Sequence, residues 1–133
     1  MYERQTSQDQ PDLAPLIHQA ALNPHLTPNS LAEICEASIQ LKVGGICTNL
    51  TLLPSARKLL PASTQTKLIA VIAFPFGGLP NNFKKAEAEW AAEQGAEELD
   101  VVPNFHALNK GSSNQFAEEL AVLCEIGLPI RVI

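Results

Sequence analysis

Apolar and polar positions along the chain follow two alternating periods. Five short apolar runs, typical of buried strands, lie at residues 16–22, 46–49, 67–74, 98–102 and 129–133. Between them, apolar residues recur three and four positions apart, which predicts amphipathic helices ending near Gly44, Pro61, Gly95 and Gly127. Strand and helix alternate until the final strand, a pattern that predicts an α/β fold with a parallel sheet and right-handed crossovers.

The run at residues 67–74 gives the clearest strand signal. Its residues are apolar at successive positions rather than at every second position. A parallel strand that is covered on both faces has this pattern. We therefore expect this segment to form a central strand of the sheet.

Two helices carry further local signals. Thr27 followed by Pro28 predicts a cap and a first-turn proline for the first helix. The third helix is expected to bury one apolar face and to leave Lys84 and Lys85 in solvent. The members of that face are Phe83, Ala86, Trp90 and Ala91.

Two architectures are compatible with the order of elements. A five-stranded doubly wound sheet of the flavodoxin type fits the 133 residues directly. A TIM barrel needs eight βα units and about 250 residues, so this chain would form a partial (β/α)8 barrel of four units plus a fifth parallel strand. The pattern leaves both open.

Composition narrows the class of protein. Hydrophobic residues make up 46% and charged residues 17%, as in a packed globular domain. The net charge of -5 argues against nucleic acid or an anionic membrane as a partner, while a small anionic ligand stays open. Residues 1–12 are polar and are expected to form a tail before one domain at residues 13–133. With no signal-like segment and no apolar run of membrane-spanning length, we expect a cytoplasmic protein.

Ligands of parallel α/β folds bind at the carboxyl ends of the strands, which directs attention to a few residues. Asp100 lies in an apolar strand, so it is either a functional acid or base or a residue paired with a structural cation. His18 and Cys47 are candidate substrate-binding residues, although a hydrogen-bonded structural histidine and a buried thiol are the simpler interpretations. The loop with Gly77 and Gly78 lacks the lysine of a P-loop.

Two kinds of chemistry find little support in the sequence. No spacing among the histidines, cysteines and carboxylates suggests a metal site. No lysine lies inside an apolar strand, where burial would lower its pKa for Schiff-base chemistry.

Three stretches are specific when their order and spacing are taken together. The first is Ile-Cys-Thr-Asn at residues 46–49, and the second is Phe-Pro-Phe-Gly at residues 74–77 with Lys-x-x-Glu-Ala at residues 84–88. The third is Gly-Ala-x-Glu-Leu-Asp-Val-Val at residues 95–102, followed by Ala-Leu-x-x-Gly at residues 107–111. This set resembles the deoxyribose-phosphate aldolase family, class I aldolases that use a lysine Schiff base inside a TIM barrel.

The resemblance implies roles for three residues. Asp100 corresponds to the family's strand-four aspartate of the proton relay. His18 stands where the family's Ile-Asp-His-Thr stretch has its aspartate, and Arg131 stands at the position of the Schiff-base lysine. An arginine stays protonated and cannot act as the attacking amine.

The resemblance also implies an activity, the reversible cleavage of 2-deoxy-D-ribose 5-phosphate to D-glyceraldehyde 3-phosphate and acetaldehyde. It implies no metal or organic cofactor and a small phosphorylated aldehyde or sugar as ligand. Because Arg131 replaces the lysine and the family's later strands are absent, we expect this chain to be inactive as it stands.

Two alternative functions remain open for this sequence. One is a non-catalytic barrel fragment that acts through ligand binding or assembly, with homo-oligomerisation covering the edges of its sheet. The other is a flavodoxin-like binding domain.

Overall fold

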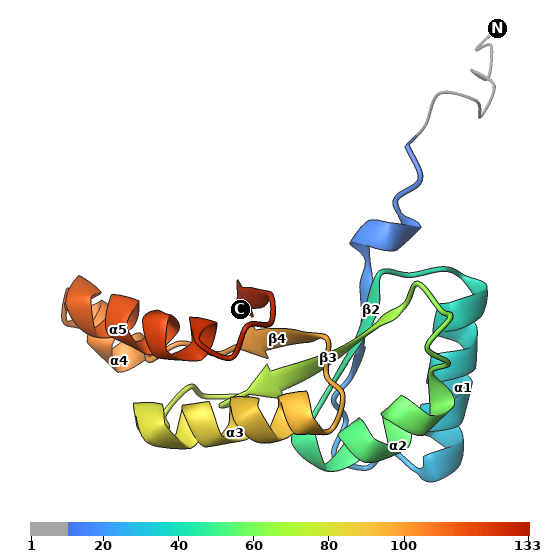
Figure 1. Cartoon of the computed structure of the whole chain (residues 1–133), viewed down its shortest axis with the longest axis horizontal. Coiled ribbons are helices and arrows are strands. Elements are labelled where there is room, and N and C mark those ends of the chain that lie inside the picture. Colours follow the sequence, from blue (N-terminus) through green and yellow to red (C-terminus); the bar gives the residue numbers. More distant parts are fainter. Residues whose placement is uncertain (1–10) are drawn as a thin grey trace, which may run out of the picture.

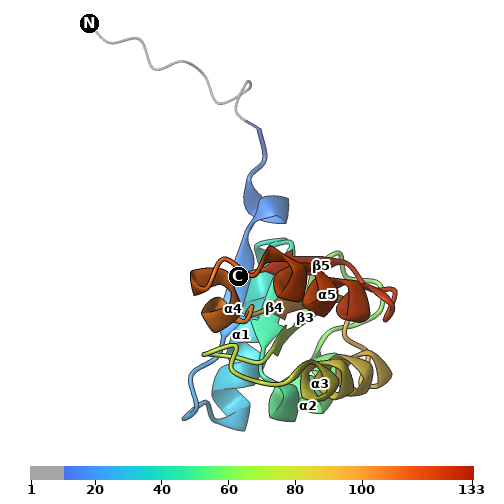
Figure 2. The same ribbon diagram turned by 90° about the vertical axis from the view of Figure 1, so that its left-hand side faces the viewer.

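The computed structural model describes residues 11–133, so most of the tail predicted at residues 1–12 lies outside the described residues. Five parallel strands form one sheet in the order β1-β2-β3-β4-β5 (Figure 1). Their bounds are β1 His18–Ala21, β2 Gly45–Thr48, β3 Lys67–Ile72, β4 Glu98–Val101 and β5 Ile130–Val132. Figure 2 shows β5 near β4 and the C terminus.

The order of the strands decides between the two architectures. In a flavodoxin-type sheet the strand order reverses after the first strand, whereas in a TIM barrel each strand pairs with the next along the chain. All four pairings here join consecutive strands, so the flavodoxin alternative is wrong. The fold is a partial TIM barrel that is not closed, with β1 and β5 at the two edges of the described sheet.

Helices connect the strands and cover one face of the sheet (Figure 1). Their bounds are η1 Ala14–Leu16, α1 Pro28–Gln40, η2 Leu50–Leu52, α2 Leu53–Leu59, α3 Asn81–Glu93, α4 Phe105–Asn109 and α5 Ser113–Cys124. The Thr27 cap is confirmed, because its hydroxyl accepts a hydrogen bond from the Ser30 N–H at 3.1 Å. The helix α4 was not predicted, since a five-residue helix is too short to show a period. Among the described residues, no helix is long and apolar enough to cross a membrane.

Side chains of the strands alternate between two apolar clusters. On the helix-covered face, Leu68, Ile72 and Leu99 belong to the main core. On the opposite face, which we call the inner face, Cys47, Ile69 and Val71 form a smaller cluster. Because β3 contributes buried residues to both clusters, the prediction of a central strand covered on both faces is confirmed.

The buried face of α3 differs from the sequence prediction. Phe83 and Trp90 are 57% and 38% exposed, while the expected solvent residue Lys84 is completely buried. Lys84 lies on the same face as Ala88 and Ala91, which are also buried. The prediction failed because it counted only apolar side chains as candidates for the core.

Lys84 is buried because its charge has a partner on α5. Its ammonium group donates to Glu119 Oε1 at 2.5 Å and to the carbonyl of Val102 at 2.9 Å. The second oxygen of Glu119 accepts from the backbone N–H of Asn104 at 3.2 Å. This ion pair therefore joins α3 and α5 to the segment that follows β4.

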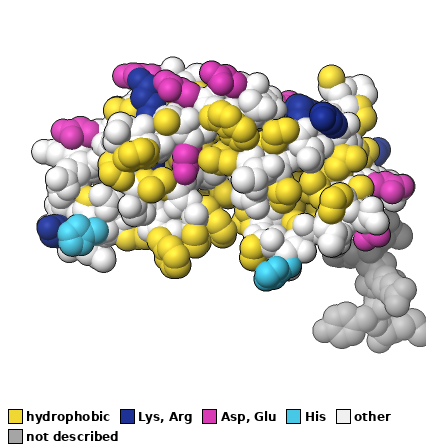
Figure 3. All heavy atoms as spheres, turned by 90° about the horizontal axis from the view of Figure 1, so that it is seen from below, with side chains coloured by type: hydrophobic (Ala, Val, Ile, Leu, Met, Phe, Trp, Pro, Cys, Tyr) yellow, Lys and Arg dark blue, Asp and Glu magenta, His cyan; other side chains and the backbone are white. Residues whose placement is uncertain are grey.

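Several large hydrophobic side chains remain on the surface. Phe76 is 83% exposed, and Leu16 is 78% exposed. Figure 3 shows hydrophobic groups spread over the face seen from below the view of Figure 1. Scattered exposed apolar residues are ordinary in globular proteins, so this distribution does not by itself define a binding surface.

We predict that Lys84→Met lowers the free energy of unfolding by about 3–5 kcal/mol, because it leaves the Glu119 carboxylate buried without its partner. Urea denaturation followed by circular dichroism measures this change. The double variant Lys84→Met, Glu119→Leu should recover most of the loss, since neither charge then remains.

The matched control is Lys85→Met, because Lys85 is the next residue and its ion pairs with Glu89 and Glu125 are solvent-exposed. Exposed ion pairs contribute at most about 1 kcal/mol. Equal destabilisation by the two single variants would contradict a structural role for the buried pair.

Candidate active site

The four candidate residues lie on four different strands and come together at the inner face. Arg131 on β5 is the common neighbour of His18 on β1 and Asp100 on β4. Asp100 in turn lies close enough to Cys47 on β2 to affect the pKa of its thiol. Residues 113 positions apart in the chain are thus in direct contact across the curved sheet.

Asp100 is the most buried charged group of this cluster. Its side chain is 8% exposed, and the guanidinium of Arg131 lies 3.4 Å from its Oδ1. This distance fits an ion pair, yet Oδ1 accepts no hydrogen bond from any residue that the structure describes. A buried carboxylate oxygen without a hydrogen-bond donor is unusual, and such groups are found more often at functional sites than elsewhere.

Arg131 connects three partners. Its Nη1 lies 2.6 Å from His18 Nδ1, and its Nη2 lies 3.4 Å from Glu98 Oε2. A guanidinium can only donate hydrogen bonds, so His18 Nδ1 must be the acceptor in this contact.

The position of His18 corrects one expectation. The sequence placed it at the carboxyl end of the first strand, but β1 begins at His18. The preceding residues form η1, and the N–H of Ile17 donates to Ala14 at 3.1 Å, which delays the start of the strand. His18 reaches the site only because the long Arg131 side chain extends to it.

Cys47 is a buried thiol beside Asp100. Burial raises the pKa of this thiol, the negative charge of Asp100 raises the pKa further, and the positive charge of Arg131 lowers it. The net effect is a raised pKa, so the thiol stays protonated at neutral pH. Cys47 therefore contributes an uncharged wall to the site rather than a nucleophile.

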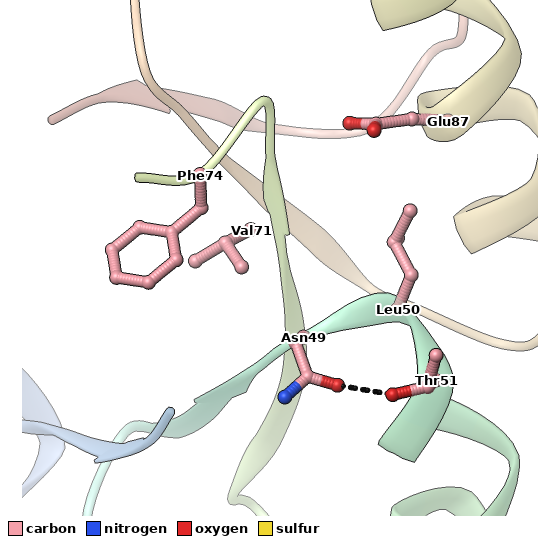
Figure 4. Close-up of a pocket in the computed structure, with 6 residues that line it drawn as sticks. All are labelled: Asn49, Leu50, Thr51, Val71, Phe74 and Glu87. Carbon is pink, nitrogen blue, oxygen red and sulfur yellow. Dashed lines mark hydrogen bonds between the residues drawn. The ribbon is translucent and has the colours of Figure 1, made fainter. Parts of the chain in front are cut away.

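A hollow of about 240 Å³ lies at the carboxyl edge of β2 and β3 (Figure 4). We call it the rim hollow, and it is lined by Asn49, Leu50, Thr51, Val71, Phe74 and Glu87. Val71 is the register partner of Asp100, which brings the rim hollow to within one strand of the carboxylate.

The loop after β3 is shaped by backbone packing rather than by a phosphate site. Gly77 has φ +67°, and a Cβ there would lie 2.0 Å from the carbonyl oxygen of Pro103. Its N–H donates to Ala73 O at 2.8 Å and is therefore not free for an anion. The glycine permits the close approach of this loop to the segment that follows β4.

Metal binding finds no support in the described part of the chain. No group of three or more histidine, cysteine or acidic residues within residues 11–133 is arranged to hold a metal ion. The acidic residues of the site contact Arg131 instead.

Two features of the site escaped the sequence analysis. Glu98 starts β4 and forms an ion pair with Arg131. It lies two positions before Asp100 in the strand, so its side chain points to the same face of the sheet, and this spacing could have predicted its place in the site. Glu87 lines the rim hollow from α3 while its Oε2 accepts from the Ala73 N–H at 2.7 Å. No sequence signal connects a helix residue to a loop 14 positions earlier.

Comparison with known proteins finds relatives of this chain among the curated aldolases. No protein-family model matches the chain. A curated deoxyribose-phosphate aldolase from Trichormus variabilis is 35% identical over 123 residues, which are 92% of this chain and 54% of that protein. The chain therefore spans about half the length of the curated relatives it matches.

Solved structures similar to this chain are also aldolases. An aldolase structure matches 91% of this chain and 54% of its own length, with a TM-score of 0.84 and 29% identity. A tetrameric deoxyribose phosphate aldolase from Aeropyrum pernix matches 90% of this chain and 51% of its own length, with a TM-score of 0.71 and 25% identity.

We predict that iodoacetamide alkylates Cys47 slowly at pH 9 and alkylates it faster in Asp100→Asn. Removing the carboxylate removes one cause of the raised pKa, and each unit by which the pKa falls increases the thiolate fraction about tenfold. Mass spectrometry of tryptic peptides measures the rate at each cysteine.

Two cysteines serve as internal controls. The exposed Cys124 should react at one rate in both proteins, and the buried Cys35 reports any general opening of the fold. An unchanged rate at Cys47 in Asp100→Asn would refute the electrostatic coupling.

Proposed function

We propose that this chain, whose sequence and fold are those of the amino-terminal part of the deoxyribose-phosphate aldolase family, presents Asp100 as the proton-transfer group of an aldolase-type site. The family reaction is the reversible cleavage of 2-deoxy-D-ribose 5-phosphate to D-glyceraldehyde 3-phosphate and acetaldehyde. The ligand proposed for this chain is accordingly a small phosphorylated aldehyde or sugar, bound without a cofactor.

The observation that supports this proposal is the buried Oδ1 of Asp100, which lies 3.4 Å from the Arg131 guanidinium and accepts no hydrogen bond from the described residues. A carboxylate oxygen without a donor can accept the hydroxyl proton of a sugar. When the adjacent carbon–carbon bond breaks, that hydroxyl becomes a carbonyl, its proton moves to the carboxylate, and the electron pair of the broken bond must pass to a Schiff base that residues 11–133 do not supply. In the reverse direction the carboxylate returns the proton to the new hydroxyl.

The neighbours of Asp100 have supporting roles in this proposal. Arg131 orients the carboxylate through their ion pair, and His18 fixes the position of Arg131 through their hydrogen bond. Cys47 and His18 then contact the bound ligand. These roles differ from that of the family's Schiff-base lysine, whose position Arg131 takes.

We further propose that this chain alone does not complete the aldolase reaction. A Schiff base needs an uncharged amine, and the cation beside Asp100 is a guanidinium. The described lysines that have acidic partners pair elsewhere, with Glu97, Glu119, Glu89 and Glu125. Residues 11–133 thus offer ligand binding and proton transfer without the nucleophile.

A second candidate function is assembly without catalysis. The edge strand β5 leaves Val132 and Ile133 42% and 44% exposed, and β1 is the opposite edge. Unpaired edges of this kind favour pairing with another chain. The tetrameric relative from Aeropyrum pernix is consistent with homo-oligomerisation, which analytical ultracentrifugation tests directly.

We predict that borohydride reduction in the presence of 2-deoxyribose 5-phosphate leaves no adduct on any lysine of this chain. The physical reason is the absence of an uncharged amine beside Asp100 within residues 11–133. Mass spectrometry of the reduced protein detects a covalent adduct. A full-length deoxyribose-phosphate aldolase treated in parallel is the positive control, and an adduct on this chain would show that it supplies its own nucleophile.

We predict that Asp100→Asn weakens the binding of D-glyceraldehyde 3-phosphate by at least about tenfold, because a hydrogen bond to a charged acceptor contributes about 1.5–3 kcal/mol. Titration followed by ¹⁵N–¹H NMR measures the affinity. The control Asp12→Asn changes an exposed carboxylate that accepts from the Ala14 N–H, outside the Asp100 cluster, and should leave the affinity unchanged. Equal affinities for wild type and Asp100→Asn would remove the main support for the proposed function.

A further inference from the structure

Two polar side chains of α3 have no part in the proton transfer proposed for Asp100. Lys84 and Glu87 are three positions apart, so they lie on one face of the helix. Each donates to, or accepts from, the backbone of a segment that follows a strand. Lys84 is bonded to the segment after β4, and Glu87 is bonded to the loop after β3. One helix thus contacts two neighbouring segments at the carboxyl edge of the sheet.

The segment after β4 is held at two points by one ion pair. The ammonium group of Lys84 donates to the carbonyl of Val102 at 2.9 Å. Its partner Glu119 accepts from the N–H of Asn104 through Oε2 at 3.2 Å. The two charged side chains are 0% and 1% exposed, so these bonds are shielded from water. Because Val102 lies two residues after Asp100, the bonds fix the chain next to the carboxylate.

The loop after β3 is held by Glu87. Its Oε2 accepts a hydrogen bond from the N–H of Ala73 at 2.7 Å. Ala73 has φ +57°, a left-handed conformation that is unfavourable for a residue with a Cβ. Ala73 is also buried, so its N–H needs an acceptor within the protein. The carboxylate therefore stabilises a backbone conformation that the loop would not adopt readily by itself.

The two segments also pack against each other. A Cβ on Gly77 would lie 2.0 Å from the carbonyl oxygen of Pro103, so the two backbones are in close contact. The N–H of Gly77 donates to Ala73 O at 2.8 Å, and the N–H of Val102 donates to Ile72 O at 3.0 Å. A displacement of one segment would therefore require the other segment to move.

We propose that Lys84 and Glu87 are positioning residues, through which α3 holds the segments after β4 and β3 in the arrangement that ligand binding at Asp100 requires. This role goes beyond stability, because both side chains are bonded to backbone atoms at the carboxyl edge. The inference deepens the proposed function and rests on it for the choice of ligand, a small phosphorylated aldehyde. It also gives a role to the Lys-x-x-Glu-Ala stretch at residues 84–88.

The first test compares Glu87→Leu with the conservative variant Glu87→Gln, which keeps an oxygen that can accept from the Ala73 N–H. The reporter is the amide of Asn104, whose own acceptor is unchanged in both variants. Hydrogen exchange of the ¹⁵N-labelled full chain, measured by NMR without ligand, should be at least about threefold faster at Asn104 in Glu87→Leu than in Glu87→Gln. The strand amide of Leu99 should exchange equally in both. Equal rates at Asn104 would overturn the coupling of the two segments.

The second test uses the double variant Lys84→Met, Glu119→Leu, which is expected to keep most of the stability. The reporter is the amide of Gly77 in the other segment, because its acceptor Ala73 is not changed. The midpoint of urea unfolding should stay near that of wild type, while exchange at Gly77 becomes at least about threefold faster. Wild-type exchange at Gly77 would show that the ion pair serves stability alone, which contradicts a positioning role.

Affinity for D-glyceraldehyde 3-phosphate is then measured for the same proteins by NMR titration. The double variant and Glu87→Leu should each bind at least about threefold more weakly than wild type, and Glu87→Gln should bind more tightly than Glu87→Leu. The control Lys85→Met lies on the same helix and loses only exposed ion pairs, so it should change neither the exchange rates nor the affinity. Wild-type affinity in both the double variant and Glu87→Leu would overturn the proposal.

Failure of this inference can be told apart from failure of the proposed function. Weaker binding by Asp100→Asn together with unchanged binding by the α3 variants would support the proposed function and overturn the positioning role. If wild type does not bind D-glyceraldehyde 3-phosphate, the proposed function fails. The ligand-free exchange rates at Asn104 and Gly77 would still decide whether α3 holds the two segments.

Discussion

The inner face of the sheet is organised by one constraint, the need of the buried Asp100 carboxylate for a nearby positive charge. An ionised carboxylate in an apolar strand is strongly disfavoured without a partner. Arg131 meets this need from the neighbouring strand and also contacts His18 at the far edge of the sheet. The curvature of the partial barrel matters here, because only a curved sheet brings side chains of β1 and β5 together.

The ion pairs Lys84–Glu119 and Asp100–Arg131 differ in burial and in how completely their atoms are hydrogen-bonded, since Arg131 is 46% exposed and Lys84 is completely buried. In the Lys84–Glu119 pair, both carboxylate oxygens accept hydrogen bonds and the ammonium has a second acceptor. In the Asp100–Arg131 pair, one carboxylate oxygen has no donor among the described residues. A fully bonded pair is typical of a structural role, which fits Lys84 and Glu119 on the helix side of the sheet. The buried Oδ1 of Asp100 on the inner side lacks a hydrogen-bond donor, and the proposed function rests on this difference.

Electrostatics also separates the two parts of the candidate site. The cluster around Arg131 contains a cation and suits a group with negative charge or a proton to transfer. The rim hollow instead has one carboxylate and no lysine or arginine among its lining residues. The two parts are neighbours in the sheet, because Val71 of the rim hollow is the register partner of Asp100.

The strand–helix alternation and the central position of residues 67–74 could be predicted from the sequence, because both depend on the pattern of neighbouring residues; the role of Asp100 stays a prediction. The consecutive strand order, the burial of Lys84 and the contact of Arg131 with His18 could be seen only in the folded chain. Lys84 illustrates the physical reason. A lysine is expected on the surface unless a partner for its charge is known. The partner of Lys84 could not be identified from the sequence, because Glu119 lies 35 positions away on another helix. Periodicity reports which side chains share a face, whereas charge pairing and cavities depend on which faces the folded sheet brings together.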